Sequence, residues 1–185
     1  MDLVSIIIPY YKKKKFILTK INSAISQSYT NIEILIVYDD ENYDDLKLLE
    51  EIKKKDERIK IIKNKKKMGA GLSRNIGISS STGNYIAFLD ADDTWEADKL
   101  SKQMSFMTDN NYLASHTSYQ IVDEYRNIIG NRVARSFLNL EDLLKSCDIG
   151  TSTVIIKKNI LDDQIKFPSI KTKEDFVLWL RILER

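Results

Sequence analysis

The stretch NYIAFLDADDTW, residues 84–95, drives an apolar run straight into three aspartates. Read as a strand, its apolar residues would lie in a core, and the carboxylates of Asp90, Asp92 and Asp93 would emerge together where the strand ends. Clustered carboxylates repel one another and need a compensating cation. A divalent metal that carries a phosphorylated ligand is the natural candidate, because such metals often bind through one or two carboxylates plus phosphates. The alternative is a solvated turn in which Asp93 or Thr94 caps the next helix.

Apolar runs alternate with segments of helical periodicity on both sides of this stretch. The runs are nearly continuous in apolar residues, as expected for strands that are covered on both faces. The alternation predicts an α/β fold with a mostly parallel central sheet and helices on both faces. The predicted strands are 3–8, 32–38, 59–62 and the apolar part of 84–95, and the predicted helices are 16–25, 43–55, 69–83 and 96–110.

The pattern changes from Tyr112 onward, where the apolar runs become shorter. We expect strands around 113–122 and 151–157, a turn near 126–131 and a helix at about 140–146. A length of 185 residues with 43% hydrophobic residues is enough to bury a sizeable core and argues for one domain.

Acidic residues follow two of the predicted strands at the point where each strand ends. Asp39 and Asp40 follow the strand at 32–38, and Asp90 to Asp93 follow the strand in the opening stretch. In parallel sheets, ligands bind beyond the carboxyl ends of the strands. Two carboxylate clusters on one edge therefore predict a ligand site there.

The overall charge excludes a general electrostatic attraction for nucleic acid, because 29 lysines and arginines face 27 acidic residues. Two basic runs, at 12–15 and 63–67, are solvated surface or a contact with an anionic membrane. Cys147 is the only cysteine, which excludes an internal disulfide and favours a reducing cytoplasm. The sequence shows no signal peptide and no apolar run of membrane-span length, so we expect any membrane contact to be peripheral. It gives no indication of an oligomeric state.

Five motifs together resemble family 2 glycosyltransferases. They are VSIIIPYY (4–11), IEILIVYDD (32–40), GLSRNIG (71–77), GNYIAFLDADDTW (83–95) and KEDFVLWLR (173–181), and they occur in the order found in that family. The resemblance implies the GT-A fold, a Rossmann-like three-layer α/β/α sandwich, over a single catalytic domain of residues 1–185. Residues 1–110 would form the nucleotide-binding half, and residues 111–185 an acceptor-side half that is incomplete at its C-terminus.

The resemblance also implies the reaction. Such an enzyme moves a sugar, with inversion, from a nucleoside-diphosphate sugar to a hydroxyl of a glycan or lipid-linked acceptor. A uridine donor and the synthesis of a bacterial surface polysaccharide such as a capsule are expected. The setting would be the cytoplasm or the inner face of the membrane.

Donor-binding residues are assigned by matching the motifs. Pro9 and Tyr11 would hold the nucleotide, with Tyr11 stacked on the base, although both neighbouring tyrosines in the first motif could instead pack beneath the first helix. Asp39 matches the aspartate that accepts the ring N–H of uracil. The family motif continues as Asp-Gly-Ser, whereas this chain continues as Asp40, Glu41 and Asn42, which makes the loop bulkier.

The arginine and the acidic motif are assigned in the same way. Arg74 would contact phosphate or orient an aspartate across the site, and a purely structural ion pair is the alternative. Asp92 would ligate Mn2+ or Mg2+, and Asp90 would bind the ribose or a metal-bound water. Gly69 and Gly71 resemble a phosphate-binding loop, which the start of a helix explains equally well.

The catalytic base is expected near the end of the sequence. Asp175 matches the general base of inverting enzymes, whereas acidic residues at a helix start, such as Glu174 and Asp175, are also common for dipole reasons. His116 is expected to be structural. Thr151 and Ser152 either pass beneath the sugar or acceptor or belong to a buried strand with satisfied hydroxyls.

Two other functions fit parts of the sequence. The segment DADDT also satisfies the D-x-D-x-T pattern of haloacid-dehalogenase-like phosphatases, in which Asp90 would be a nucleophile. That pattern normally follows the first strand of its domain, and three predicted strands precede it here. The other alternative is a truncated domain that binds nucleotide-sugar and transfers nothing.

Overall fold

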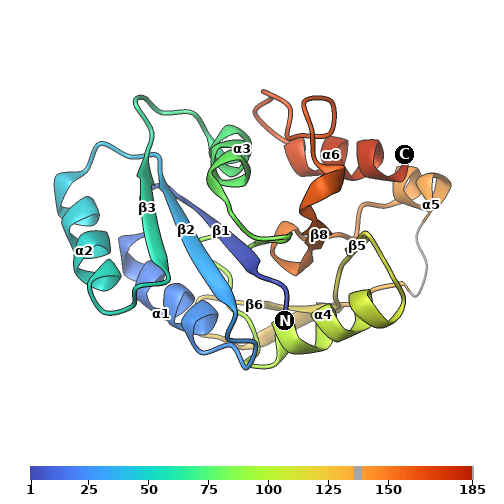
Figure 1. Ribbon diagram of the computed structural model, residues 1–185, viewed down its shortest axis with the longest axis horizontal. Coiled ribbons are helices and arrows are strands. Elements are labelled where there is room, and N and C mark those ends of the chain that lie inside the picture. The colour runs from blue at the N-terminus through green and yellow to red at the C-terminus, as the bar shows by residue number, and fades with distance from the viewer. Residues whose placement is uncertain (136–138, 185) are drawn as a thin grey trace.

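The structure is a computed structural model that describes residues 1–135 and 139–184 (Figure 1). Its central sheet has six strands in the order β3-β2-β1-β4-β8-β5. The first four strands are parallel to one another, whereas β8 is antiparallel to both of its neighbours. The strands are β1 (Val4–Tyr10), β2 (Ile32–Tyr38), β3 (Ile59–Lys63), β4 (Tyr85–Phe88), β5 (Ala114–Ser115) and β8 (Ile155–Lys157).

Helices cover both faces of this sheet and complete a three-layer α/β/α sandwich. One core lies between the sheet and α1, α2 and α4, and a second core lies between the sheet and the segments that include α3, α5 and α6. Figure 1 shows these two groups of helices on opposite sides of β1, β2 and β3. The helices are α1 (Lys14–Ile25), α2 (Tyr43–Lys53), α3 (Ala70–Ser80), α4 (Lys99–Asp109), α5 (Leu140–Lys145) and α6 (Glu174–Leu183), with short 3₁₀ turns η1 (Thr151–Thr153) and η2 (Lys158–Ile160).

The continuous apolar runs of the first half form the predicted strands because both faces are covered. All seven residues of β2 are buried, and so are all four residues of β4. The residues of β1 alternate between the two cores, so that Ile6 and Ile8 face one core and Ile7 faces the other. The predicted parallel α/β arrangement is therefore confirmed.

The sheet opens between β1 and β4. These two strands pair only as far as Ile7 and Phe88, whereas β1 continues beside β2 to Tyr10 and Tyr38. Since β2 and β4 lie on opposite sides of β1, this is the switch point at which open α/β sheets bind ligands. Pro9 lies just past the last β4 pair.

The departure from the family pattern after Asp39 has a structural reason. Asn42 is the N-cap of α2, and its side-chain oxygen accepts hydrogen bonds from the backbone N–H groups of Asp44 and Asp45. Asp40 accepts from the N–H of Lys12 at 3.0 Å and so ties this loop to the end of β1.

Three predictions for the second half are wrong in detail. The strand expected at 113–122 is two strands, because β5 joins the main sheet and the chain then leaves it to form β6 (Tyr119–Val122). β6 pairs with β7 (Ile128–Arg132) in a separate antiparallel ribbon, which we call the β6–β7 hairpin. The turn expected at 126–131 therefore lies earlier, at 123–127, where the Asp123 carboxylate accepts two backbone N–H groups.

The strand expected at 151–157 begins late. Its first three residues form η1, in which the hydroxyl of Thr153 donates to the carbonyl of Gly150, and only the last three form β8. Local hydrogen bonds of hydroxyl side chains compete with strand pairing in this way. The helix expected from residue 96 begins at Lys99.

Candidate active site

The acidic loop at Asp90–Asp93 is held by three separate elements. Arg74 of α3 donates to Asp90 Oδ1 at 2.5 Å, and Ser152 of η1 donates to Asp93 Oδ2 at 2.6 Å. The ammonium of Lys13 lies 2.6 Å from Asp92 Oδ2. Asp92 is exposed, with about half of its side chain accessible (52%), and Asp93 is exposed as well, whereas Asp90 is partly buried. The predicted cluster of carboxylates is therefore real, and each one has a different cationic or hydroxyl partner.

Arg74 is the centre of a buried ion-pair network. Its guanidinium donates to Asp90 and, at 3.1 Å, to Glu174 Oε1 of α6, and it lies over the ring of Phe167. Burial alone would lower the pKa of Arg74, but Asp90 and Glu174 outweigh burial and raise the pKa. The structural ion pair expected as the alternative role is thus present, and it orients the acidic loop.

Two glycines allow α3 to start where it does. Gly69 is the N-cap of α3 and has a φ of 85°, a backbone conformation that residues with a side chain rarely adopt. A Cβ on Gly71 would lie 2.8 Å from Glu174 Cγ. The absence of a side chain at Gly71 therefore lets α6 approach α3 closely enough for the pair between Arg74 and Glu174.

Asp39 is tied to the loop that leads into α3. Its Oδ1 accepts from Asn64 Nδ2 and from the N–H of Met68, both at 2.7 Å, and its Oδ2 accepts from the N–H of Gly69 at 2.7 Å. The residue is 4% exposed. Asp39 thus fixes the start of α3 as well as the end of β2. The backbone N–H of Met68 has no residue-specific signal in the sequence, and Asn64, whose side-chain amide makes its contact, stands in a basic run that gives no indication of it.

The two tyrosines of the first motif have different positions. Tyr10 is buried, stacks on Tyr38 and donates to Asp45 Oδ2 at 2.7 Å, and burial followed by this hydrogen bond raises its pKa. Tyr11 is exposed, and Lys67 both donates to its hydroxyl and lies 4.0 Å from its ring centroid. Tyr10 is therefore structural. Tyr11 and Lys67 are exposed at the sheet edge, where a ligand could contact them. The sequence indicates Lys67 only as part of a basic run.

Consecutive hydroxyl residues of η1 connect the acidic loop to α6. Ser152 accepts from the N–H of Asp90 at 2.9 Å and donates to Asp93, and its backbone carbonyl accepts from Trp95 Nε1. The neighbouring hydroxyl of Thr151 donates to Asp175 Oδ2 at 3.0 Å. The acidic loop and Asp175 are thus positioned by adjacent residues of one segment. Both hydroxyls are buried and hydrogen-bonded, as the structural alternative predicted.

The electrostatics of the acidic loop favour an added cation. Desolvation raises the pKa of Asp93, and the nearby carboxylates of Asp90 and Asp92 also raise it, whereas the hydrogen bond from Ser152 lowers it. In residues 1–135 and 139–184, no three His, Cys, Asp or Glu side chains come together to enclose a metal. The donor set therefore fits a metal that is completed by substrate phosphates rather than one caged by protein.

Two basic side chains each have a buried nitrogen without a hydrogen-bond partner among the described residues. Lys99 Nζ lies 4.2 Å from the Trp95 ring centroid, and burial lowers the pKa of Lys99 to about 7. His116 Nδ1 is likewise unpaired, and burial lowers the pKa of His116.

Comparison with known proteins settles the family. Residues 5–164 match the sequence profile described as glycosyl transferase family 2. The match covers most of the chain. The chain belongs to this family. A relative in Escherichia coli, named UDP-Glc:alpha-D-GlcNAc-diphosphoundecaprenol beta-1,3-glucosyltransferase WfaP, is 40% identical over 185 residues, which is 100% of this chain and 72% of the relative.

Solved structures show that this family 2 chain has the GT-A fold. The structure of S. aureus TarS 1–349 in complex with UDP-GlcNAc matches with a TM-score of 0.81 at 21% identity, over 99% of this chain and 53% of that one. A mannosyltransferase from Pyrobaculum calidifontis, solved with GDP-Man and Mn2+, matches with a TM-score of 0.68 at 16% identity, over 94% of this chain and 49% of that one. The chain spans about half the length of each of these two solved chains.

The family match removes one alternative. A phosphatase that uses Asp90 as a nucleophile does not fit a family 2 member, and in the structure Asp90 is held by the guanidinium of Arg74. In the described part of the chain, none of the helices is long and apolar enough to cross a bilayer.

Proposed function

We propose that this family 2 chain transfers a sugar from a uridine-diphosphate-linked donor to a hydroxyl of a lipid-linked glycan, with inversion, in the synthesis of a surface polysaccharide. The observation that carries this proposal is the hydrogen bonding of η1. Ser152 holds Asp93 of the acidic loop, and the adjacent Thr151 holds Asp175. A donor-side group and a candidate base are thereby positioned by adjacent residues of one short segment, which supports a reaction in which donor and acceptor are held together.

The donor would bind along the carboxyl edge of β1, β2 and β4. Pro9 and Tyr11 at the end of β1 would line the nucleotide, and Asp39 at the end of β2 would accept the ring N–H of the base. Asp39 Oδ2 accepts one backbone hydrogen bond within the described residues, which leaves it capacity for another. The bound UDP-GlcNAc of the TarS structure supports a uridine donor.

The metal would be held by Asp92, with Asp90 on the ribose or on a water of the metal. Asp92 is an exposed carboxylate, and its partner Lys13 is a cation that a metal ion could displace. A bound Mn2+ or Mg2+ would neutralise charge on the departing diphosphate. The Mn2+ in the Pyrobaculum mannosyltransferase supports this assignment by analogy of fold.

Asp175 would accept the proton of the acceptor hydroxyl as this hydroxyl attacks the anomeric carbon. Its neighbour Glu174 is engaged with Arg74, whereas Asp175 accepts from Thr151 and from the N–H of Phe176. The chain would act at the cytoplasmic face of a membrane, on a lipid-linked acceptor of the kind named for WfaP.

Calorimetry with UDP, in the presence and absence of Mn2+, tests the donor site. We expect Mn2+ to strengthen UDP binding and Asp92→Asn to abolish this metal dependence, because one carboxylate ligand is lost. The matched control is Asp98→Asn, since Asp98 has similar exposure (50%) and also lies 2.6 Å from a lysine.

If neither Mn2+ nor Asp92→Asn changes the affinity for UDP, the donor site is wrongly assigned. Metal-dependent binding without sugar transfer, tested with donor sugars and a lipid-linked acceptor, would favour a binding domain without activity.

A further inference from the structure

The loop that connects β3 to α3, residues 64–69, surrounds a buried carboxylate that has no salt bridge. Asp39 is 4% exposed, and none of the salt bridges among the described residues includes it. The hydrogen bond to Tyr11 and, to a smaller extent, the charge of Asp39 raise the pKa of Lys67, so one cation of the loop interacts with Asp39 without pairing with it. A buried charge of this kind needs hydrogen-bond donors, and the loop supplies them.

The donors are distributed unevenly over the two oxygens of Asp39. Oδ1 accepts from Asn64 Nδ2 and from the N–H of Met68, whereas Oδ2 accepts from the N–H of Gly69. Each carboxylate oxygen has two lone pairs. Within the described residues Oδ1 is therefore saturated, and Oδ2 has one lone pair left for a ligand.

Asn64 is the donor whose contribution depends on its side chain, because Met68 and Gly69 donate from the backbone. Its Nδ2 also donates to Ser73 Oγ at 3.0 Å, while its own Oδ1 is buried without a partner among the described residues. An unpaired buried acceptor is unfavourable. The opposite orientation of the amide would place Oδ1 against the carboxylate of Asp39, so the bond to Asp39 fixes the amide at the expense of its oxygen.

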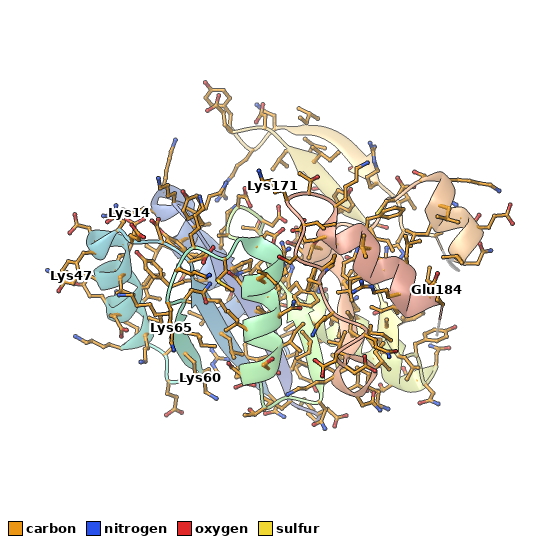
Figure 2. The ribbon with its side chains drawn as sticks, turned by 90° about the horizontal axis from the view of Figure 1, so that it is seen from above. Lys14, Lys47, Lys60, Lys65, Lys171 and Glu184 are labelled. Carbon is orange, nitrogen blue, oxygen red and sulfur yellow. The ribbon has the colours of Figure 1, made fainter. Side chains whose placement is uncertain are left out.

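This arrangement lies at the sheet edge that the donor would occupy. The N–H of Asn64 donates to the carbonyl of Tyr38 at 3.0 Å, and the N–H of Asp39 donates to the carbonyl of Tyr10 at 2.9 Å. The ends of β1, β2 and β3 are thus connected where Asp39 leaves the sheet. Figure 1 shows the loop rising from the end of β3 to the start of α3, and Figure 2 marks it from above by Lys65.

The number of open acceptor positions on Asp39 matters for the choice of a base. Uracil carries a hydrogen on its ring nitrogen N3, whereas cytosine has no hydrogen there and donates from its exocyclic amine. One open lone pair in a fixed position can select the ring N–H. A carboxylate with a second open oxygen could turn and accept the amine instead.

We propose that Asn64 is a positioning residue for base selection: it saturates Oδ1 of Asp39, so that only Oδ2 accepts from the base, which favours uracil over cytosine. This inference rests on the proposed function, in which Asp39 accepts the ring N–H of the base. Asn64 itself does not touch the nucleotide and acts through Asp39.

Calorimetry with UDP and with CDP, both in the presence of Mn2+, tests the proposal. The two nucleotides have the same ribose and diphosphate, so the ratio of their affinities depends on the base. We expect the unchanged protein to bind UDP at least about tenfold more tightly than CDP, the order given by one hydrogen bond to a charged group. Asn64→Leu keeps a similar volume without N–H donors and should reduce this ratio to about threefold or less.

Ser73→Ala is the matched control, because it removes the other partner of the same amide. Ser73 is fully buried, and its substitution leaves the contact between Asn64 and Asp39 in place. The preference for UDP over CDP should therefore be kept. Thermal unfolding of each variant identifies loss of fold, and Asn64→Ala provides a second test if leucine does not fit.

The outcomes separate this inference from the proposed function. A preference for UDP that survives in folded Asn64→Leu or Asn64→Ala overturns the role of Asn64 and leaves the donor site standing. Equal weakening of UDP and CDP by these variants also overturns it, because a purely structural role would lower both affinities alike. An equal loss of preference in Ser73→Ala would assign the selection to the packing of α3 and not to the amide. The absence of UDP binding would contradict the proposed donor site itself, and this inference with it.

Discussion

Glu174 and Asp175 are adjacent carboxylates at the start of α6, yet their partners assign them different tasks. Glu174 lies 3.1 Å from the buried guanidinium of Arg74, and its side chain is 16% exposed. Asp175 accepts from the hydroxyl of Thr151 and remains partly accessible. Glu174 is held in place by the guanidinium of Arg74, whereas Asp175 has no cationic partner among the described salt bridges. The geometry therefore favours Asp175 as the base.

Asp175→Asn is expected to lower sugar transfer by roughly 10²–10⁴-fold, because the amide keeps the shape but cannot take a proton. Nucleotide binding measured by calorimetry should barely change, since the base faces the acceptor. The comparison variant Glu174→Gln should instead lower thermal stability by weakening the contact with Arg74. Near-normal transfer by Asp175→Asn in an active protein would place the base elsewhere.

At the scale of elements, the sequence predicts the first half well and the second half poorly. The strands up to β4 are buried on both faces, so their continuous apolar runs identify them. β5 has only two residues, and the β6–β7 hairpin exposes side chains on both strands, so neither produces a clear periodic pattern. Asp39 and Asp90 follow the predicted strands of the first half, so the positions of these carboxylates at the sheet edge were predictable.

The interactions that complete the site were not predictable in the same way. The N–H groups of Met68 and Gly69 bind Asp39 through backbone geometry, which no residue type encodes. Lys67 belongs to a basic run whose composition indicates solvated surface, yet it contacts Tyr11. The link from Thr151 to Asp175 depends on η1, a turn that replaced part of a predicted strand.

Glu33 of β2 gives the sheet a measurable pH dependence. Burial raises the pKa of Glu33, but hydrogen bonds from Lys60, Ser5 and Thr82 outweigh burial and lower the pKa to about 2 from 4.5. Because the folded-state pKa is lowered, the stabilisation is present above about pH 4.5 and is lost as the pH falls toward 2.

Glu33→Gln should therefore lower the free energy of unfolding at pH 7 by about 3 kcal/mol, the order expected for breaking a buried charged network. The variant should also lose part of the decrease in stability between pH 5 and pH 2. Urea unfolding across this pH range measures both effects. Identical pH profiles for the two proteins would contradict this assignment of Glu33.

Gly71→Ala tests the contact between α3 and α6. Alanine gains at most about 1 kcal/mol of helix propensity. The new Cβ would lie 2.8 Å from Glu174 Cγ, and overpacking of this kind costs about 1–3 kcal/mol. We expect a net loss of stability and slower sugar transfer, because the start of α6 carries Asp175. Gly130→Ala is the control, since the nearest atom there is 3.5 Å away, and equal behaviour of both variants would exclude the steric explanation.

At the scale of the whole molecule, Arg74 joins segments that are distant in sequence. It connects α3 with Asp90, 16 residues away, and with Glu174, 100 residues away. Removal of its charge would leave two partly buried carboxylates facing each other. The stability of α6 on the sheet should therefore depend on this guanidinium as well as on the apolar contacts of Leu178 and Trp179.

Arg74→Met is expected to destabilise the protein by roughly 3–5 kcal/mol, the cost of removing one partner of a buried ion pair. Hydrogen exchange should show the largest loss of protection in α6, and adding Glu174→Gln should recover part of the stability. Lys102→Met, which removes an exposed pair with Asp98 within α4, should change stability by less than about 1 kcal/mol. Equal effects of Arg74→Met and Lys102→Met would contradict the role of the network.

The hydroxyls of η1 limit where segments of two related enzymes can be joined in a chimera. A chimera that joins the first strands of one enzyme to the last helix of another preserves the geometry of the site only if both residues of each hydrogen-bonded pair remain compatible. In this chain those pairs are Ser152 with Asp93, Thr151 with Asp175, and Arg74 with Glu174. The design of a chimera with altered acceptor specificity therefore has to keep these three residue pairs matched.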